Sequence, residues 1–213
     1  MERKMEMGQI VEGRRITLAE LKKMAEAARD NVWDIAGSVG RTPKIYLHWT
    51  AGHYGQCWDD YHINIDKDGS IYVTTEDLSE VLEHTWKRNT GAIGVTLECC
   101  ADATTNDIGS EPPTSKQIDS MAQVIMTLCN ALWLTINKEC VLTHGEAADN
   151  EDGDESTYGA EECYGPHSGR LERWDLEFLG TDESPKYDPD GEMRGGDVLR
   201  GKAIWYQNRE DES

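Results

Sequence analysis

The sequence predicts a single α/β domain with a central mixed β-sheet flanked by helices. Short apolar segments rich in β-branched and aromatic residues recur at 45–50, 92–98 and 140–144, as buried strands do. Two long amphipathic stretches are interspersed with these segments. A chain of 213 residues can bury one sizeable core, so one domain is expected.

Both helices are predicted from a start signal followed by apolar residues at helical spacing. Thr17-Leu18-Ala19-Glu20 and Thr114-Ser115-Lys116-Gln117 are capping boxes, in which the first and last side chains can each satisfy an exposed backbone N–H. Apolar side chains then recur at helical spacing from Leu21 to Val32 and from Ile118 to Ile136. We expect the second helix to pack against the sheet.

The segment 61–73 predicts a β-hairpin. Its first half alternates apolar and polar residues, Asp66–Gly69 is a turn in which the glycine can adopt a positive φ, and Ser70–Val73 returns as the second strand. The apolar run Ala92–Leu97 lacks this alternation, which favours a central strand buried on both faces. The sheet is therefore expected to combine a hairpin with fully buried strands.

Composition divides the chain into a leader, a domain and a tail. Residues 1–13 are expected to be a flexible leader, and the domain is expected over 14–180. An insertion at about 146–170 is rich in glycine and acid, which is typical of a solvated loop, and it lacks the spacing of an EF-hand calcium loop. Residues 181–213 are rich in proline, glycine and charge, and we expect a tail that docks on the domain through apolar residues.

A formal net charge of −20 argues against functions that depend on a basic surface. Nucleic-acid binding needs a basic footprint on the phosphates, so we expect no nucleic-acid partner. No run approaches the roughly 20 apolar residues of a membrane-spanning helix, so no membrane insertion is expected. The start of the chain has charges without an apolar stretch, which is not the pattern of a signal peptide. We expect a monomer that is cytoplasmic as synthesised.

Two histidines, His48 and His144, each end an apolar segment. If their strands are neighbours, both imidazoles project from one rim of the sheet. Hydrolytic zinc sites take three protein ligands and leave the fourth position to water. Asp175, which follows the insertion, can supply a third ligand. The alternative ligands are His62, His84 and Cys163.

Five short motifs occur along the chain in a fixed order. They are His48-Trp49-Thr50; Tyr61-His62 with Asp68-Gly69 and Ile71; His84 with Asn89; Ile93-Gly94-Val95-Thr96-Leu97-Glu98; and Thr143-His144. Together they resemble the zinc-dependent N-acetylmuramoyl-L-alanine amidases of the peptidoglycan-recognition-protein superfamily, which include bacteriophage lysozyme-type amidases. The resemblance covers roughly residues 42–180 and implies the amidase fold.

The resemblance implies a Zn2+ site and its ligands. The family binds zinc through a histidine on the first strand, a histidine after the long helix and a later Cys or Asp, which here are His48, His144 and Asp175. Arg173 stands where the family often has a Lys before the last ligand, and a cation there can stabilise the oxyanion that develops on the amide carbonyl. Tyr61 stands where phage-type amidases carry a Tyr, with a role in proton handling or oxyanion stabilisation.

Four further residues receive roles from the resemblance. Recycling amidases of the family use a Glu in the strand that here contains Ile93-Gly94-Val95. When the two strands are aligned, Thr96 stands at the position of that Glu. Because side chains alternate, Glu98 shares that face and is a candidate base. His84 would line the cleft and contact the substrate. Trp49 and Thr50, beside the first ligand, are candidate substrate-binding walls of the groove.

The implied function is hydrolysis of the amide between N-acetylmuramic acid and L-alanine in peptidoglycan. The expected lack of a signal peptide suits an endolysin of a phage or prophage that reaches the cell wall through a holin-type lesion. Two alternatives are a cytosolic amidase that recycles muropeptides and a non-catalytic peptidoglycan-binding module. The chain departs from the family pattern at the third ligand, because a long connection separates His144 from Asp175 and Trp174-Asp175-Leu176 replaces the usual Asp-Pro-Gly.

Overall fold

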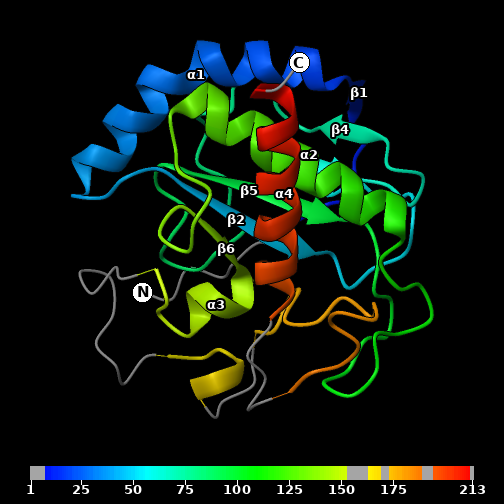
Figure 1. Cartoon of the computed structure of the whole chain (residues 1–213). Helices are drawn as coiled ribbons and strands as arrows, with labels where there is room; N and C mark the ends of the chain where they lie inside the picture. The colour runs from blue at the N-terminus through cyan, green and yellow to red at the C-terminus, as the bar shows by residue number, and fades with distance from the viewer. Residues whose placement is uncertain (1–7, 153–162, 169–172, 189–193, 212–213) are drawn as a thin grey trace.

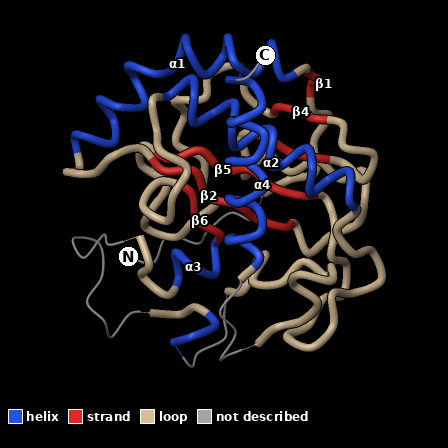
Figure 2. The backbone as a smooth tube through the Cα atoms, in the orientation of Figure 1, coloured by secondary structure: helices blue, strands red, loops and turns tan. Residues whose placement is uncertain are grey.

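The computed structural model describes residues 8–152, 163–168, 173–188 and 194–211. Within them a six-stranded mixed sheet has the strand order β1-β4-β3-β5-β2-β6, and helices pack against it (Figures 1 and 2). This confirms the predicted fold class. The strands are β1 (Arg14–Ile16), β2 (Lys44–Trp49), β3 (Ile63–Ile65), β4 (Ile71–Val73), β5 (Ala92–Leu97) and β6 (Val141–Thr143). The helices are α1 (Leu18–Ser38), α2 (Ser115–Leu132), α3 (His144–Ala148), the 3₁₀ helix η2 (Pro166–Ser168) and α4 (Gly195–Asp211).

Strand β2 lies in the parallel part of the sheet. It pairs with β5, where His48 is opposite Thr96, and with β6, where Leu47 is opposite Thr143. Strand β3 joins β5 in parallel and forms the predicted hairpin with β4, with Gly69 at a φ of 84° in the turn. Strand β1, which the sequence analysis did not predict, adds antiparallel to β4. Because parallel strands end at the same edge, the residues that follow β2, β5 and β6 meet there.

The two faces of the sheet differ in what covers them. Ile45 and Leu47 belong to the main apolar cluster, together with buried residues of α1, α2 and α4. The opposite face carries Tyr46 and a much smaller cluster that includes Ala147 of α3. His48 shares this second face because side chains alternate along a strand. The three long helices therefore bury one face, and the histidine points to the other.

Capping boxes begin α1, α2 and α3. The boxes predicted at Thr17 and Thr114 are both present, with the side-chain and backbone hydrogen bonds that define them. A third box, Thr143 with Glu146, begins α3 directly after β6. Its Thr-x-x-Glu pattern is visible in the sequence, but Glu146 also begins the acidic, glycine-rich stretch whose composition predicts a solvated loop, and the structure shows a short buried helix there.

The N-terminal segment differs from the predicted leader. Residues 8–13 lie beside the loop that follows β2, where the Val11 N–H donates to the Cys57 carbonyl at 2.8 Å. This contact continues into β1, so part of the expected leader belongs to the folded domain. Residues 1–7 lie outside the described part of the chain.

The C-terminal segment contains a long helix where a docking tail was expected. Leu199 and Ala203 of α4 are fully buried in the main cluster, and Figure 1 shows α4 crossing in front of the sheet beside α2. The helix was missed because its sequence carries a weak apolar pattern and begins with two glycines, which have low helix propensity. Among the residues that the structure describes, no helix combines the length and apolar content needed to cross a membrane.

The start of the acidic insertion is buried, which corrects the expectation of a solvated loop there. The side chains of Asp149 and Asp152 are only 5% and 0% exposed, and they form ion pairs with Arg194 and Arg88. These basic partners come from distant segments, so the composition of the insertion could not reveal them. Residues 153–162 lie outside the described part.

Met121 provides a test of how α2 packs on the sheet. It is fully buried in the main cluster, so Met121→Ala is expected to lower the free energy of unfolding by about 2–5 kcal/mol, because truncation removes apolar contacts and leaves a cavity. Urea unfolding measures this loss. Val39→Ala is the control, since Val39 is 47% exposed and its truncation is expected to change stability by less than about 0.5 kcal/mol. Equal effects of the two substitutions would contradict the assigned core.

Candidate active site

Three residues that can bind a metal ion meet at the carboxyl edge of the parallel strands. His48 lies near the end of β2, His144 begins α3 directly after β6, and Asp175 follows η2. The register of β2 with β6 brings the two histidines together, because Leu47 is opposite Thr143. Asp175 approaches them from the C-terminal part of the chain. The structure thus gathers the three residues that the resemblance implied as ligands.

The potential ligand atoms form a compact triangle. His48 Nδ1 lies 3.2 Å from His144 Nδ1 and 3.3 Å from Asp175 Oδ2, and His144 Nδ1 lies 3.6 Å from the same oxygen. Zinc bonds to nitrogen and oxygen are about 2.0–2.2 Å long, and tetrahedral angles then place neighbouring ligand atoms about 3.3–3.6 Å apart. The triangle therefore fits three ligands of one tetrahedral zinc ion.

Burial and the neighbouring side chains together set the protonation states of His48 and Asp175. His48 is fully buried, and this lowers its pKa to about 4. Burial by itself would raise the pKa of Asp175, but His144 and His48 outweigh it and lower that pKa well below its ordinary value. At neutral pH the cluster offers a neutral His48 imidazole and an ionised carboxylate. These are the forms in which both groups bind metal.

A hydroxyl that the sequence analysis did not single out orients His48. Thr85 Oγ1 lies 3.3 Å from His48 Nε2 and 2.9 Å from His84 Nδ1. The nitrogen of His48 that faces away from the cluster therefore has a partner, and such a partner fixes the ring of a metal-binding histidine. The only sequence signal for Thr85 is its position next to His84.

His84, which was predicted to line the cleft and contact the substrate, is buried beside His48. The residue is 5% exposed, and its ring centroid lies 5.4 Å from that of His48 and 5.6 Å from that of His62. Gly94 makes this packing possible, because a Cβ there would lie 2.6 Å from His84 Cγ. Burial, reinforced by the neighbouring histidines, lowers the pKa of His84 well below its ordinary value.

Tyr61 and Arg173 lie beside the cluster. The Tyr61 ring centroid is 4.9 Å from that of His48. Burial, reinforced by Asp175, raises the pKa of Tyr61 above its ordinary value, so its hydroxyl stays protonated and can donate a hydrogen bond. The side chain of Arg173 is exposed, and its charge acts to lower the pKa values of Tyr61 and His48. The guanidinium is therefore within electrostatic range of both rings.

Two aromatic residues that the sequence analysis missed extend the site toward the surface. The Tyr164 ring centroid lies 6.2 Å from that of His144 and 5.8 Å from that of Trp86. Tyr164 is 7% exposed, and its hydroxyl has no hydrogen-bond partner among the described residues, whereas Trp86 is 47% exposed. Tyr164 lies within the irregular insertion, where no pattern distinguished it.

Trp49 does not form the predicted wall of the groove, and Thr50, which was predicted beside it, is partly exposed. Trp49 is 5% exposed and packs against Trp174 and Phe178, with ring centroids 5.6 and 5.8 Å away. Alternation along β2 directs it to the face opposite the first ligand. Thr50 Oγ1 accepts a hydrogen bond from the Cys99 N–H at 3.2 Å. Both residues therefore stabilise the end of β2.

The contacts of Glu98, the candidate base, come from segments other than those that carry the three clustered residues. Its backbone N–H donates to the Ile65 carbonyl, and its own carbonyl accepts from Gln117 Nε2 at 3.0 Å. Burial, reinforced by the charge of Asp66, raises the pKa of Glu98 to about 7. These neighbours belong to the β3–β4 hairpin and α2, so the shared strand face did not bring Glu98 to the three ligands.

The alternative ligands make other contacts. Both ring nitrogens of His62 are engaged: the Gly94 N–H donates to Nδ1 at 3.1 Å, and Nε2 lies 2.9 Å from the Glu80 carbonyl. Cys163 Sγ accepts a hydrogen bond from Asn150 Nδ2 at 3.0 Å. Neither residue belongs to the triangle of ligand atoms.

Solved structures of two endolysins and of a Drosophila PGRP protein resemble the chain at low similarity. The endolysin amidase LysCS from Clostridium intestinale is 23% identical with a TM-score of 0.36, covering 58% of this chain and 75% of that one. The Ph2119 endolysin from a Thermus scotoductus bacteriophage is 18% identical with a TM-score of 0.39, covering 54% and 77%. Drosophila PGRP-LB is 13% identical with a TM-score of 0.36, covering 65% and 74%. No curated protein sequence matches the chain.

A family model described as N-acetylmuramoyl-L-alanine amidase matches residues 38–165, which is more than half of the chain. The matched region includes His48 and His144, whereas Asp175 lies beyond it. On the strength of this match, the chain belongs to the N-acetylmuramoyl-L-alanine amidase family.

Proposed function

We propose that the protein is a zinc-dependent hydrolase that cleaves the amide between N-acetylmuramic acid and L-alanine in peptidoglycan. The observation that carries the zinc assignment is the triangle of His48 Nδ1, His144 Nδ1 and Asp175 Oδ2, with edges of 3.2, 3.3 and 3.6 Å. Three segments far apart in sequence supply these atoms, and their spacing is that of tetrahedral zinc ligands. The family membership supplies the substrate class.

The protein residues of the site have separate tasks. His48, His144 and Asp175 would hold the metal, and Thr85 fixes the orientation of the His48 ring. A bound Zn2+ would act as a Lewis acid that polarises the scissile carbonyl and acidifies water. The remaining task is to stabilise the negative charge that develops on the carbonyl oxygen of the substrate.

Tyr61 is suited to that task because it keeps its proton. Burial raises the pKa of its hydroxyl, so at neutral pH the group donates a hydrogen bond and does not carry a charge. Its ring lies 4.9 Å from that of His48, which places the residue beside the cluster. A donor fixed beside a developing oxyanion stabilises the transition state more than the ground state.

Arg173 supplies positive charge from the exposed side of the cluster. A guanidinium remains protonated at any pH that the protein tolerates, so its contribution is electrostatic and includes no proton transfer. Arg173 lies two residues before Asp175, so the same segment carries the cation and the third proposed ligand. We propose that it attracts and polarises the carbonyl oxygen.

We further propose that the substrate is polymeric peptidoglycan, cleaved in the manner of an endolysin. The wall formed by Tyr164 and Trp86 leads from His144 to the surface, where Trp86 is 47% exposed. An exposed aromatic ring beside a partly buried cluster offers a platform to a substrate that remains largely outside. The alternative settings are recycling of soluble muropeptides and binding without hydrolysis.

Tyr61→Phe tests the assigned hydrogen-bond donor. The substitution keeps the ring and removes the hydroxyl, so kcat is expected to fall about 10²–10³-fold, the usual loss for one oxyanion donor, while zinc content stays unchanged. Rates of amide cleavage and elemental analysis of the same samples measure both. Tyr72→Phe is the matched control, because Tyr72 lies in β4, and it is expected to retain full activity. An unchanged kcat in Tyr61→Phe would remove Tyr61 from the mechanism.

The products formed from purified peptidoglycan test the reaction itself. Hydrolysis of the proposed amide releases stem peptides with a free L-alanine amine, and Asp175→Ala is expected to abolish this release by removing a metal ligand. Asp182→Ala, at an exposed position of the same region, should behave as the unmodified protein does. New reducing sugar ends would show glycosidic cleavage, and binding without product would show a recognition module. Turnover of soluble muropeptides but not of the polymer would indicate a recycling enzyme.

A further inference from the structure

We infer that Arg194, immediately before α4, is a positioning residue for the metal centre, and that Arg200, six residues further along the chain and within the helix, has the same role. The inference rests on the proposed zinc site and adds to it the part of the chain that holds the ligands in place. Both arginines lie beyond residues 38–165, the region that the amidase family model matches.

Each arginine binds a carboxylate two residues after a ligand. Arg194 Nε donates to Glu177 Oε2 at 2.8 Å, and Glu177 follows Asp175 by two positions. Arg200 binds Glu146 with two hydrogen bonds of 2.7 Å, and Glu146 follows His144 by two positions. The two pairs tie both segments that bear these ligands to a single helix.

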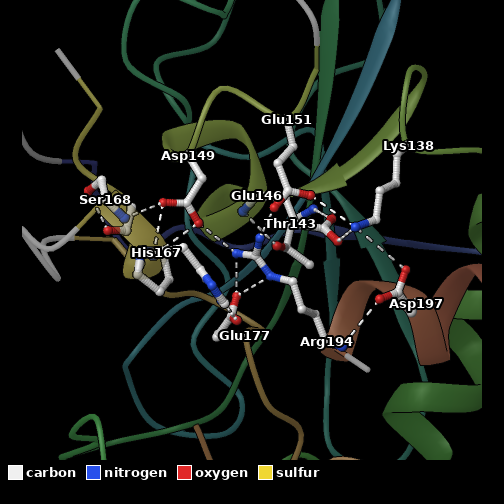
Figure 3. Close-up of polar contacts among 12 residues, drawn as sticks. Lys138, Thr143, Glu146, Asp149, Glu151, His167, Ser168, Glu177, Arg194 and Asp197 are labelled. Atoms are coloured by element: carbon white, nitrogen blue, oxygen red, sulfur yellow. Dashed lines mark hydrogen bonds and ion pairs between the residues drawn. The ribbon is translucent and has the colours of Figure 1, made fainter. Parts of the chain in front are cut away.

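The ion pairs are buried, which makes their geometry specific. The side chains of Arg194 and Arg200 are each 6% exposed. Those of their partners Glu177 and Glu146 are 2% and 0% exposed, respectively. Arg194 also donates to Asp149 at 2.9 Å, so it lies between carboxylates of two segments (Figure 3). Removing one partner of a buried pair leaves an uncompensated charge and is strongly unfavourable. The arrangement therefore resists small displacements.

The backbone beside Asp175 needs such support. Leu176 adopts a φ of 57°, in the left-handed region that a branched side chain rarely occupies, and such conformations persist only where surrounding contacts hold them. The Gly195 N–H donates to the Glu177 carbonyl at 2.9 Å. A Cβ on Gly195 would lie 2.0 Å from the Leu176 carbonyl oxygen, so only glycine permits this approach. Arg194 and Gly195 together fix the turn that aims the Asp175 carboxylate.

The zinc dissociation constant of Arg194→Met separates positioning from simple electrostatics. The substitution makes the surroundings more negative, which by itself favours a cation. Positioning predicts the opposite result, a dissociation constant about 10–100-fold higher, which is the usual cost of losing a group that orients a metal ligand. Competition with a chromophoric chelator measures the constant in samples whose fold is verified by circular dichroism.

Three further variants complete this experiment. Glu177→Gln removes the same ion pair with the opposite change in charge, and it is expected to weaken zinc binding as Arg194→Met does. Arg200→Met breaks the second pair with the same change in charge as Arg194→Met, so it serves as the discriminating test if Arg194→Met does not fold. Lys202→Met is the matched control, because Lys202 lies on the same helix and its side chain is 42% exposed in a pair with Asp119. This control should bind zinc as the unmodified protein does.

The outcomes distinguish this inference from the proposed function. If the unmodified protein binds zinc and both pair-breaking variants bind it more weakly, Arg194 positions the site. If the unmodified protein binds zinc and Arg194→Met binds it equally well or more tightly, the inference is wrong and the zinc site stands. If the unmodified protein binds no zinc, the proposed function fails and the inference fails with it.

Discussion

The parallel pairing of β2 with β6 is the constraint on which the site depends. With Leu47 opposite Thr143, the next residues are His48 in β2 and His144 at the start of α3, and both lie at the same edge of the sheet. A shift of this register by one residue would turn one imidazole to the opposite face. The long helices bury the other face of the sheet, which fixes the register through the alternating apolar residues of β2. Packing of the core thus determines the separation of two proposed metal ligands.

The third proposed ligand is held by a different kind of interaction. Asp175 lies outside regular secondary structure, beside a left-handed residue, and its segment is tied to α4 by buried ion pairs. Buried ion pairs contribute little net stability, because desolvation offsets much of their attraction, but they define geometry strongly. This division suits the proposed metal site: the sheet register places two of the proposed ligands, and the third is placed by a polar network that the acidic composition of the chain makes possible.

Much of the fold could be predicted from local patterns. Of the site, the sequence predicted the three clustered residues but few of the side chains around them. The capping boxes at Thr17 and Thr114 and the turn at Gly69 depend on neighbouring residues, so the sequence revealed them. Helix α4 and the buried carboxylates depend on partners far along the chain, which composition cannot show. Trp49 follows His48 in the sequence, but alternation along the strand turns its side chain to the opposite face of the sheet. Thr85 and Tyr164 were missed because only the folded chain brings them to the cluster.

The zinc content of the purified protein tests the central claim most directly. Protein prepared without chelators and then dialysed is predicted to retain about one zinc per chain, because three ligands are preorganised around one site. His48→Ala is predicted to lose the metal, and His53→Ala, at a side chain that is 62% exposed, is predicted to keep it. Elemental analysis gives the ratio. A protein that binds no zinc, or a His48→Ala variant that keeps its full content, would contradict the account.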